Sequence, residues 1–345
     1  MSAPKTTASL PQWPTTAPPP LRNAIVRQTP EDFRVTELPL VEPAGEGEHL
    51  WVWVRKRDHN TGAVASMLAR AASVRTRDVG YAGLKDRRAV TQQWFSIHLP
   101  GRSVSLPTLL AEGVELLAQR RHGRKLRRGA LRGNRFEIVL RACDGAPEAV
   151  EERLARLARE GFPNYFGEQR FGRDGGNIDK ARQMLRGERR VRDREQRSLL
   201  ISTARSLVFN DLLARRVERD CWQRPVAGDL MLLGDGNSLF AVEAIDDMLL
   251  ERAERGEVHP AGPLPGRPGK LRPTAAAAAI EQPVLERYAS LIEGLDRQRV
   301  DAGRRALRVM PVDLSHRWLD ATTLRLRFAL PPGGYATALL RELVR

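Results

Sequence analysis

Alternating apolar and polar positions predict strands in the first part of the chain. Residues 49–54 read His-Leu-Trp-Val-Trp-Val, a run of β-branched and aromatic residues that is typical of a strand. After Thr61 the spacing becomes that of a helix with one apolar face laid on the sheet, formed by Val64, Met67, Leu68, Ala71 and Ala72. Further strands are expected at residues 77–84, 92–99 and 135–142.

Helical spacing then dominates the middle of the chain. A helix over residues 148–160 is followed by Gly161, a residue type that often terminates helices, and two more helices are predicted at 177–186 and 196–218. Residues 256–273 are dense in Gly and Pro, which predicts a long ordered loop or a subdomain boundary.

Strand alternation returns near the end of the chain, where Leu324, Leu326 and Phe328 alternate with arginines. A Pro-Pro-Gly-Gly turn at 331–334 then leads into a short helix from about Tyr335 to Leu343. Because strands come before and after the helical middle, the pattern predicts one β-rich domain that is interrupted by an insertion.

The charge of the chain points to a polyanionic partner. The 57 Lys and Arg residues outnumber the 42 Asp and Glu residues, which gives a formal net charge of +15. A basic composition inherited from an Arg- and Ala-rich genome is the alternative explanation. The 345 residues are enough for about two domains. Cys143 and Cys221 form no metal-spaced pair, which favours a reducing compartment, the cytoplasm.

Neither a membrane span nor a signal peptide is expected. No apolar run reaches the roughly 18 residues that a membrane-spanning helix needs. Residues 1–20 contain six prolines and several Ser and Thr but no apolar core. They are therefore predicted to form a disordered tail.

Asp86 is the candidate for the chemistry. It lies in Gly-Tyr-Ala-Gly-Leu-Lys-Asp-Arg-Arg-Ala-Val, residues 80–90, where one acid is surrounded by Lys85, Arg87 and Arg88. Glycines allow a close approach of backbone and ligand, and the three cations are expected to keep the acid ionised and to attract a polyanion. An anionic nucleophile at such a place suggests an enzyme that acts on nucleic acid. The alternative is a turn acid that merely solvates its neighbours.

A second nucleic-acid signal lies at residues 119–135, which contain eight Lys or Arg and no acid. On a folded surface such a run is expected to contact several phosphates, which would make the affinity depend strongly on salt. A solvated basic loop without function is the alternative. The run from Arg186 to Arg197 mixes both signs of charge and favours a solvated helix or turn.

Four motifs in order resemble the tRNA pseudouridine synthase D (TruD) family. They are Pro-Glu-Asp-Phe-Arg-Val-Thr-Glu at 30–37, Gly-Leu-Lys-Asp at 83–86, Gly-Asn-Arg-Phe at 133–136 and Pro-Asn-Tyr-Phe-Gly-Glu-Gln-Arg-Phe-Gly at 163–172. The resemblance runs from about Ile25 to Leu343. It implies conversion of uridine to pseudouridine, in bacterial members at position 13 in the D arm of tRNA, chiefly tRNA for glutamate.

The resemblance also implies the fold and the domain organisation. The expected class is α+β, with a mixed, mainly antiparallel pseudouridine synthase-type sheet, flanking helices and an inserted α/β TRUD domain. Residues 21–158 and 312–345 would form the catalytic domain, and residues 159–311 the inserted domain, here called the insertion. RNA would bind in the basic cleft between them.

Two catalytic roles carry over from the family. Asp86 takes the place of the catalytic aspartate, and Arg27 takes the place of a basic residue that pairs with it, where Lys is the more usual residue. A nucleophilic carboxylate beside RNA phosphates needs a close cation to remain ionised, and a guanidinium can grip it with two bonds. For Arg27, a phosphate contact or a surface position is the alternative role.

Four residues are candidates for holding the target base, which must be extruded and then held by stacking and edge hydrogen bonds. Resemblance indicates Phe33 and Tyr335 as stacking residues, with Tyr335 at a position where relatives usually have Phe. Phe136 is a third stacking candidate, although strand alternation places it equally well in the core with Ile138 and Leu140. Asn134 offers a donor and an acceptor to a base edge or ribose, with a turn asparagine as the alternative.

The reaction implied by the resemblance needs neither a metal nor a redox cofactor. The six histidines form no HxH or HxxxH pair, and the chain has no dinucleotide fingerprint. The motif at 163–172 lacks the spacing of a phosphate loop, so nucleotide binding there is rejected; its arginines are left as candidates for RNA phosphates and its aromatics for the domain junction.

The expected partner is tRNA, without a membrane or a small-molecule cofactor, and nothing in the sequence demands more than a monomer. Two other functions remain open at this point. One is a noncatalytic RNA-binding or chaperone protein on the same fold, and the other is a glycosidase-like hydrolase that would release free uracil.

Overall fold

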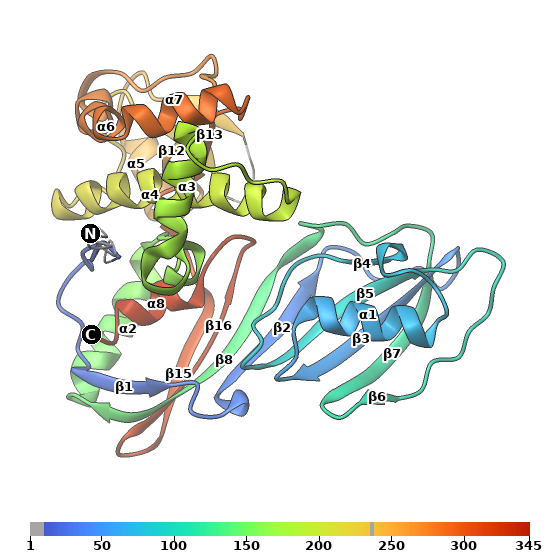
Figure 1. The fold of residues 1–345 in the computed structure, drawn as a ribbon. Helices are drawn as coiled ribbons and strands as arrows, with labels where there is room; N and C mark the ends of the chain where they lie inside the picture. The colour runs from blue at the N-terminus through green and yellow to red at the C-terminus, as the bar shows by residue number, and fades with distance from the viewer. Residues whose placement is uncertain (1–9, 235–237) are drawn as a thin grey trace, which may run out of the picture.

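The computed structural model describes residues 10–234 and 238–345, and it consists of a large sheet with helices on it and a smaller lobe that contains most of the helices (Figure 1). Among these residues, no helix is long and apolar enough to cross a membrane.

The large sheet has the strand order β15-β16-β8-β2-β5-β3-β7-β6, with β1 also paired to β8 and β4 to β5. Its strands are β1 (Asn23–Val26), β2 (Phe33–Pro39), β3 (His49–Arg57), β4 (Val79–Tyr81), β5 (Val90–His98), β6 (Leu109–Ala111), β7 (Val114–His122), β8 (Leu131–Asp144), β15 (Val312–Asp320) and β16 (Thr323–Leu330). Within the described part of the chain, every pairing in this sheet is antiparallel except that of β2 with β5. The prediction of a mixed, mainly antiparallel sheet is confirmed.

Helices cover one face of this sheet in two separate places (Figure 1). They are α1 (Thr61–Ala71), α2 (Pro147–Glu160) and α8 (Ala336–Arg341). The predicted apolar face of α1 is confirmed, because Val64 and Leu68 are fully buried in one cluster with Val52 and Val54 of β3. Gly161 ends α2 as predicted, with a φ of +74°, and a Cβ there would lie 2.5 Å from the carbonyl oxygen of Val309.

The insertion contains a second, four-stranded sheet in the order β11-β10-β12-β13. Its elements are α3 (Gly176–Arg186), α4 (Arg194–Glu218), β10 (Leu230–Leu233), β11 (Leu239–Ala241), α5 (Asp247–Glu254), β12 (Val258–Leu264), α6 (Ala275–Arg287), α7 (Ala289–Arg297) and β13 (Gly303–Ala306). The two predicted helices at 177–186 and 196–218 correspond to α3 and α4. Two short strands, β9 (Phe162–Pro163) and β14 (Arg308–Val309), pair with each other where the chain enters and leaves the insertion.

The predicted loop over residues 256–273 is confirmed for 265–273, which contain no helix or strand, and is wrong for β12. This strand pairs with both β10 and β13, although Pro260 and Pro263 lie within it. Proline cannot donate to a ladder, so its presence in a strand paired on both sides is uncommon. β12 is nevertheless buried over most of its length, which shows that packing has overridden the local preference of these residues.

The predicted disordered tail is wrong for residues 10–20, while its residues 1–9 lie outside the described part. Trp13 is 7% exposed and packs beside Tyr165 and Phe171, with ring centroids 6.1 and 5.2 Å away. Its indole nitrogen donates to Asp211 at 2.7 Å. Burial of one large aromatic ring and this hydrogen bond hold a proline-rich segment against the insertion.

The large sheet and the insertion share one apolar cluster. Phe136 and Leu326 of the sheet belong to the same buried set as Phe162 and Phe209 of the insertion. All strands of the large sheet come from residues 23–144 and 312–330, and those of the second sheet from 230–306. The division at 159 and 311 remains a prediction that this strand membership supports.

Candidate active site

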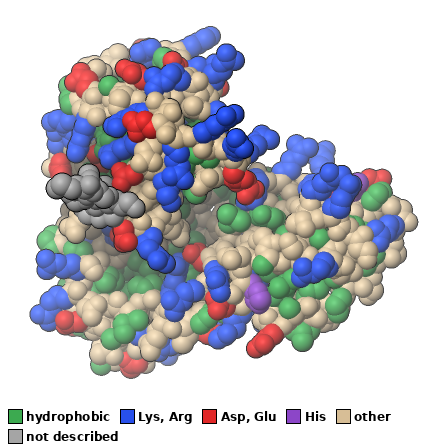
Figure 2. Space-filling view, in the orientation of Figure 1, with side chains coloured by type: hydrophobic (Ala, Val, Ile, Leu, Met, Phe, Trp, Pro, Cys, Tyr) green, Lys and Arg blue, Asp and Glu red, His purple; other side chains and the backbone are tan. Residues whose placement is uncertain are grey.

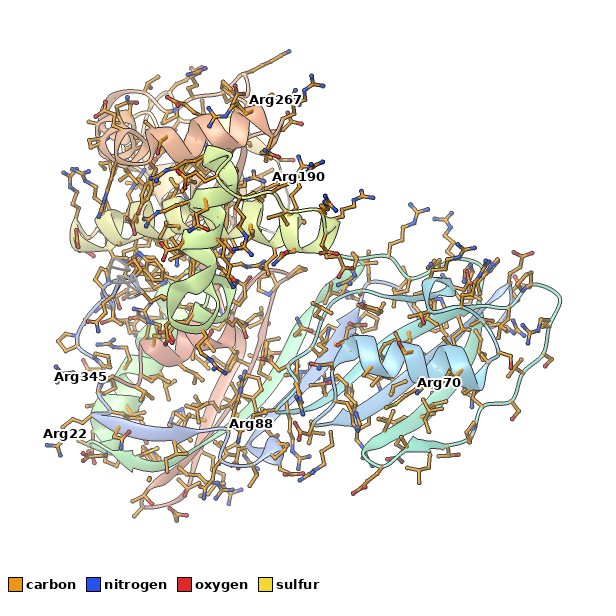
Figure 3. All side chains as sticks on the ribbon, viewed as in Figure 1. Arg22, Arg70, Arg88, Arg190, Arg267 and Arg345 are labelled. Atoms are coloured by element: carbon orange, nitrogen blue, oxygen red, sulfur yellow. The ribbon has the colours of Figure 1, made fainter. Side chains whose placement is uncertain are left out.

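Asp86 lies in the loop that joins β4 to β5, on a partly open surface. Its carboxylate is 28% exposed, and Oδ1 accepts a hydrogen bond of 3.0 Å from Nη2 of Arg27. Arg88, in the same loop, is labelled near the lower centre of Figure 3. The space-filling view is hollowed where the insertion faces the right-hand part of the sheet (Figure 2). The acid is therefore paired with a cation and still reachable from solvent.

Arg27 is held in place from two sides. It follows β1 directly and has a φ of +61°, a left-handed conformation that non-glycine residues rarely adopt. The guanidinium carbon lies 3.8 Å from the ring centroid of Phe33, so the cation stacks on an aromatic face while it binds Asp86. Two of the predicted site residues, Arg27 and Phe33, thus orient the third.

The three cations next to Asp86 in sequence do not bind its carboxylate. Lys85 turns inward, where its Nζ donates to the buried carboxylate of Glu37 at 2.8 Å. Arg87 faces Asp58, with 3.7 Å between Nε and Oδ1. The expectation that Lys85, Arg87 and Arg88 hold the acid is corrected as far as direct contact goes: among the described residues none of the three pairs with its carboxylate, and the direct partner is Arg27, which lies far away in the sequence.

Lys56 is a functional candidate that sequence reasoning missed. It has no exposed surface, and its Nζ donates to the backbone carbonyl of Asp86 at 2.8 Å and to that of His59 at 2.7 Å. Burial lowers the pKa of Lys56 to about 8, although the charge of Asp86 opposes the shift. One signal was available, because alternation places Lys56 on the same face of β3 as the buried Val52 and Val54.

The backbone of the Asp86 loop is fixed by a buried polar network. The hydroxyl of Thr61 accepts from the Lys85 amide at 2.9 Å and donates to the side-chain oxygen of Gln93 at 3.2 Å. The Gln93 amide in turn donates to the carbonyl of Gly83 at 3.1 Å. Since these bonds come from α1 and β5, two elements of the fold set the position of the nucleophile candidate.

Phe33 and Phe136 lie in the core of the structure. They are 1% and 6% exposed, and their rings meet edge to face at 6.1 Å. Phe136 also stacks on Phe328 at 5.3 Å. Phe136 therefore lies in the core, which is one of the two roles that the sequence left open. For either ring to stack on a base, it would have to become more accessible.

Asn134 of β8 lies opposite the end of β16, the strand that leads to Tyr335, and the two side chains make different contacts. The side-chain oxygen of Asn134 is buried, and none of the described residues donates a hydrogen bond to it. Asn134 pairs with Leu330 at the end of β16, and the chain then reaches Tyr335, whose hydroxyl accepts from Arg170 at 2.9 Å. A buried acceptor without a donor is costly unless a ligand or water satisfies it.

The motif at 163–172 forms the junction between the insertion and the large sheet. Arg305 of β13 donates to the backbone and side-chain oxygens of Asn164 and, at 2.9 Å, to the carbonyl of Gly333. Its guanidinium also lies 4.1 Å from the ring centroid of Phe166. Burial lowers the pKa of Arg305 to about 10. These contacts give the motif a structural role, and they tie Arg170 and Tyr335 to the same junction.

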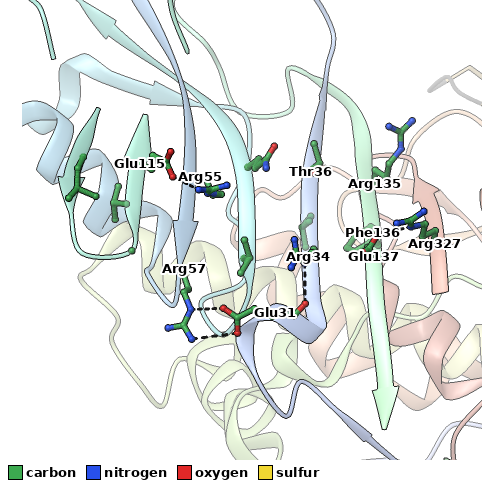
Figure 4. Close-up of a pocket in the computed structure, with 16 residues that line it drawn as sticks. Glu31, Arg34, Thr36, Arg55, Arg57, Glu115, Arg135, Phe136, Glu137 and Arg327 are labelled. Carbon is green, nitrogen blue, oxygen red and sulfur yellow. Dashed lines mark hydrogen bonds and ion pairs between the residues drawn. The ribbon is translucent and has the colours of Figure 1, made fainter. Parts of the chain in front are cut away.

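A basic groove lies on the other face of the large sheet. We call this cavity of about 670 Å³ the rear groove, and Arg55 and Arg57 of β3 line it (Figure 4). Lys56, which lies between them in the sequence, contacts the Asp86 backbone on the opposite face of the sheet. Three of the five arginines that line the rear groove form ion pairs within it, Arg55 with Glu115, Arg57 with Glu31 and Arg327 with Glu137. The rear groove is therefore separate from the Asp86 site.

Within the described ranges, no group of three or more His, Cys, Asp or Glu side chains is arranged to hold a metal ion.

Comparison with known proteins gives a consistent result over nearly the whole chain. A family model described as tRNA pseudouridine synthase D (TruD) matches residues 20–189 and 176–343. The tRNA pseudouridine synthase D of Xanthomonas oryzae pv. oryzae is 47% identical over 338 residues, which cover 93% of this chain and 91% of the relative. That of Hydrogenovibrio crunogenus is 44% identical over 325 residues, covering 94% and 93%.

A solved structure is similar in fold. The crystal structure of the putative tRNA pseudouridine synthase D from Methanosarcina mazei superposes with a TM-score of 0.67, at 22% identity, and covers 99% of this chain and 98% of that one.

Proposed function

The chain belongs to the tRNA pseudouridine synthase D family, and on that premise we propose that it isomerises uridine 13 in the D arm of tRNA, chiefly tRNA for glutamate, with Asp86 as nucleophile. Pseudouridine synthase activity follows from the family. The position in the tRNA, the tRNA species and the role of Asp86 are the finer parts of the proposal.

The observation that carries the proposal is the partly exposed carboxylate of Asp86 with one oxygen bound by Arg27 at 3.0 Å. RNA phosphates near a carboxyl group favour its neutral form, and a guanidinium in direct contact opposes this. Lys56 adds a second positive charge below the loop, where it holds the Asp86 carbonyl. The acid is thereby supplied with charge compensation before RNA arrives.

The reaction is an isomerisation. The N1–C1′ bond of the uridine breaks, the uracil turns while it remains bound, and a C5–C1′ bond forms. The hydrogen of C5 leaves as a proton and N1 takes up a proton, so no redox step occurs. Attack of the Asp86 carboxylate on either the sugar or the base would serve this sequence.

Four further residues complete the proposal. Asn134, with its unsatisfied buried oxygen, is proposed to accept a hydrogen bond from the base or ribose. Tyr335 and Phe33 are proposed to stack on the base, which requires that Arg27 leave the face of Phe33 or that the base use the other side. Phe136 is proposed to support Phe33 through their edge-to-face contact.

The test is tritium release from tRNA labelled at uracil C5. The wild type is expected to release tritium and Asp86→Asn to release none, while both bind tRNA with similar affinity. Asp58→Asn is a matched control, because Asp58 is an acid close in sequence that pairs with Arg87, and it should keep the activity. Release by Asp86→Asn, or none by the wild type although it binds tRNA tightly, would refute the assignment of Asp86.

Two product analyses separate the alternatives. Sequencing of the tRNA product should place pseudouridine at position 13, and another position would overturn the finer assignment only. Mass spectrometry should find no free uracil and no abasic tRNA, the products that a hydrolase would leave.

A further inference from the structure

The connection between β7 and β8 carries four cations on the edge of the large sheet. These residues, 123–130, read Gly-Arg-Lys-Leu-Arg-Arg-Gly-Ala, and we call them the basic rim. Arg124, Lys125, Arg127 and Arg128 are all exposed. Figure 2 shows Lys and Arg side chains gathered over the end of the sheet around β4.

The basic rim is seated firmly on the sheet. Leu126 is buried in a small cluster with Trp51 and Trp94, and its amide donates to the hydroxyl of Ser96 at 2.9 Å. The indole nitrogen of Trp51 donates to the Arg124 carbonyl at 2.9 Å. The cationic side chains therefore extend from a backbone that is already ordered, so that binding a ligand there costs little backbone entropy.

The rim is attached to the strand that leads to Asp86. A Cβ on Gly80 would lie 2.4 Å from the carbonyl oxygen of Leu126, so the rim crosses β4 where only glycine leaves room. The amide of Gly129 donates to the Ala82 carbonyl at 2.8 Å. Since Ala82 precedes Asp86 by four residues, chain geometry places their Cα atoms at most about 14 Å apart.

Arg128 wraps over the edge of the sheet toward the face that carries α1. Its guanidinium carbon lies 4.2 Å from the ring centroid of Tyr81, and its Nη2 donates to the Tyr81 hydroxyl at 2.9 Å. Tyr81 packs in turn against Phe95, which lies under α1. The rim therefore reaches from the rear of the sheet to the side on which Asp86 lies.

The cations of the rim differ from those of the rear groove in having no acid beside them. In the described part of the chain, no ion pair within 4.0 Å involves Arg124, Lys125, Arg127 or Arg128. In the rear groove, by contrast, three of the five arginines each bind a glutamate, Arg55, Arg57 and Arg327. Four like charges on one short segment repel one another, and a polyanion that neutralises them would relieve this repulsion.

We propose that the basic rim binds phosphates of the RNA strand next to the target uridine and so holds that strand over Asp86. This inference rests on the proposed function, because it takes the same tRNA as the ligand. It assigns the sequence-independent part of binding to the rim and leaves recognition of the base to the residues around Asp86.

The test compares the salt dependence of binding in two matched double variants. R124A/R127A removes two exposed cations from the rim, and R57A/R327A removes two from the rear groove, where the side chains are 55% and 54% exposed. Affinity for the tRNA transcript is measured at several salt concentrations. Each lost phosphate contact lowers the slope of log K against log salt by about 0.7 to 0.9, so R124A/R127A should lose about 1.4 to 1.8.

Three outcomes are decisive. R57A/R327A is expected to keep the wild-type slope, and R124K/R127K, which retains the charges, is expected to restore it. In tritium release, R124A/R127A should raise KM while kcat at saturating tRNA stays near that of the wild type. A wild-type slope for R124A/R127A, or an equal loss in R57A/R327A, would overturn the inference even if the wild type is active. An inactive wild type would refute the proposed function and leave the comparison of slopes intact.

Discussion

The ammonium group of Lys56 and the backbone carbonyl of Asp86 are joined by a 2.8 Å hydrogen bond inside the protein. The candidate nucleophile is thus anchored at both ends, by Arg27 at its carboxylate and by Lys56 at its main chain. Burial of a lysine that has no carboxylate bound to it is unfavourable in free energy. We infer that Lys56 is kept at this position because it fixes the backbone of Asp86.

Lys56 should make the stability of the protein depend on pH. Its pKa is lowered from 10.5 to about 8 in the folded state, so between these values the unfolded chain binds more protons at this site. The free energy of unfolding contributed by Lys56 therefore rises with pH from about 8 to 10.5. Denaturant titrations should show that the stability of the wild type relative to Lys56→Met is constant below about pH 8 and rises between about pH 8 and 10.5. A relative stability that stays constant across this range would contradict the prediction.

Arg27→Met should weaken catalysis more than binding. The substitution removes a charge-assisted hydrogen bond to Asp86 and leaves the acid without its direct cation. A bond of this kind contributes about 1.5 to 3 kcal/mol, so kcat should fall about 10- to 150-fold. Arg27→Lys keeps the charge and should recover much of the loss in the tritium assay. If the Met and Lys variants were equally active, the pairing would have no catalytic role.

Gly80→Ala should destabilise the protein through the basic rim. The added methyl group would meet the carbonyl oxygen of Leu126 at 2.4 Å, which forces a backbone to move. Overpacking of this kind costs about 1 to 3 kcal/mol. Gly62→Ala is the control, because a Cβ there meets nothing within 4 Å and should stabilise α1 by up to about 1 kcal/mol. Equal effects of the two substitutions in thermal unfolding would show that the contact with the rim is unimportant.

Arg305→Met should loosen the junction between the insertion and the large sheet. It leaves the backbone and side-chain oxygens of the buried Asn164 without their Arg305 donor, and each such group costs about 1 to 3 kcal/mol. Arg255→Met removes an exposed arginine from an ion pair with Glu251 and should change the stability by less than about 0.5 kcal/mol. The denaturant midpoints of the two variants measure this difference. A loss of stability in Arg305→Met no greater than that in Arg255→Met would show that Arg305 does not stabilise the junction.

Local patterns predicted the elements around the site better than the contacts within it. The alternation at 49–54 and the apolar face from Val64 to Leu68 were sufficient to predict β3 and α1, because burial of one face determines both. The pairing of Asp86 with Arg27 was inferred through a resemblance, and the 3.0 Å contact is consistent with it. No local pattern revealed that Lys85 turns to Glu37, since that pair depends on how β2 lies beside β5.

Composition was misleading where a single side chain determined the outcome. Six prolines predicted disorder up to residue 20, yet the Trp13 side chain packs against the rings of Tyr165 and Phe171. Pro260 and Pro263 predicted a loop, yet they lie in a buried strand. In both places a long-range contact outweighs the preference of the chain nearby, and such contacts leave no periodic signal in the sequence.

The short ladder of β9 and β14 brings the two ends of the insertion side by side, with Pro163 opposite Arg308. By connectivity alone, the insertion could be removed and the chain closed by joining β9 directly to β14. The apolar cluster shared by Phe136 and Phe209 argues against this, because excision would expose buried apolar side chains of the large sheet to solvent. The large sheet and the insertion should therefore unfold together in one calorimetric transition, and neither should fold stably as an isolated fragment.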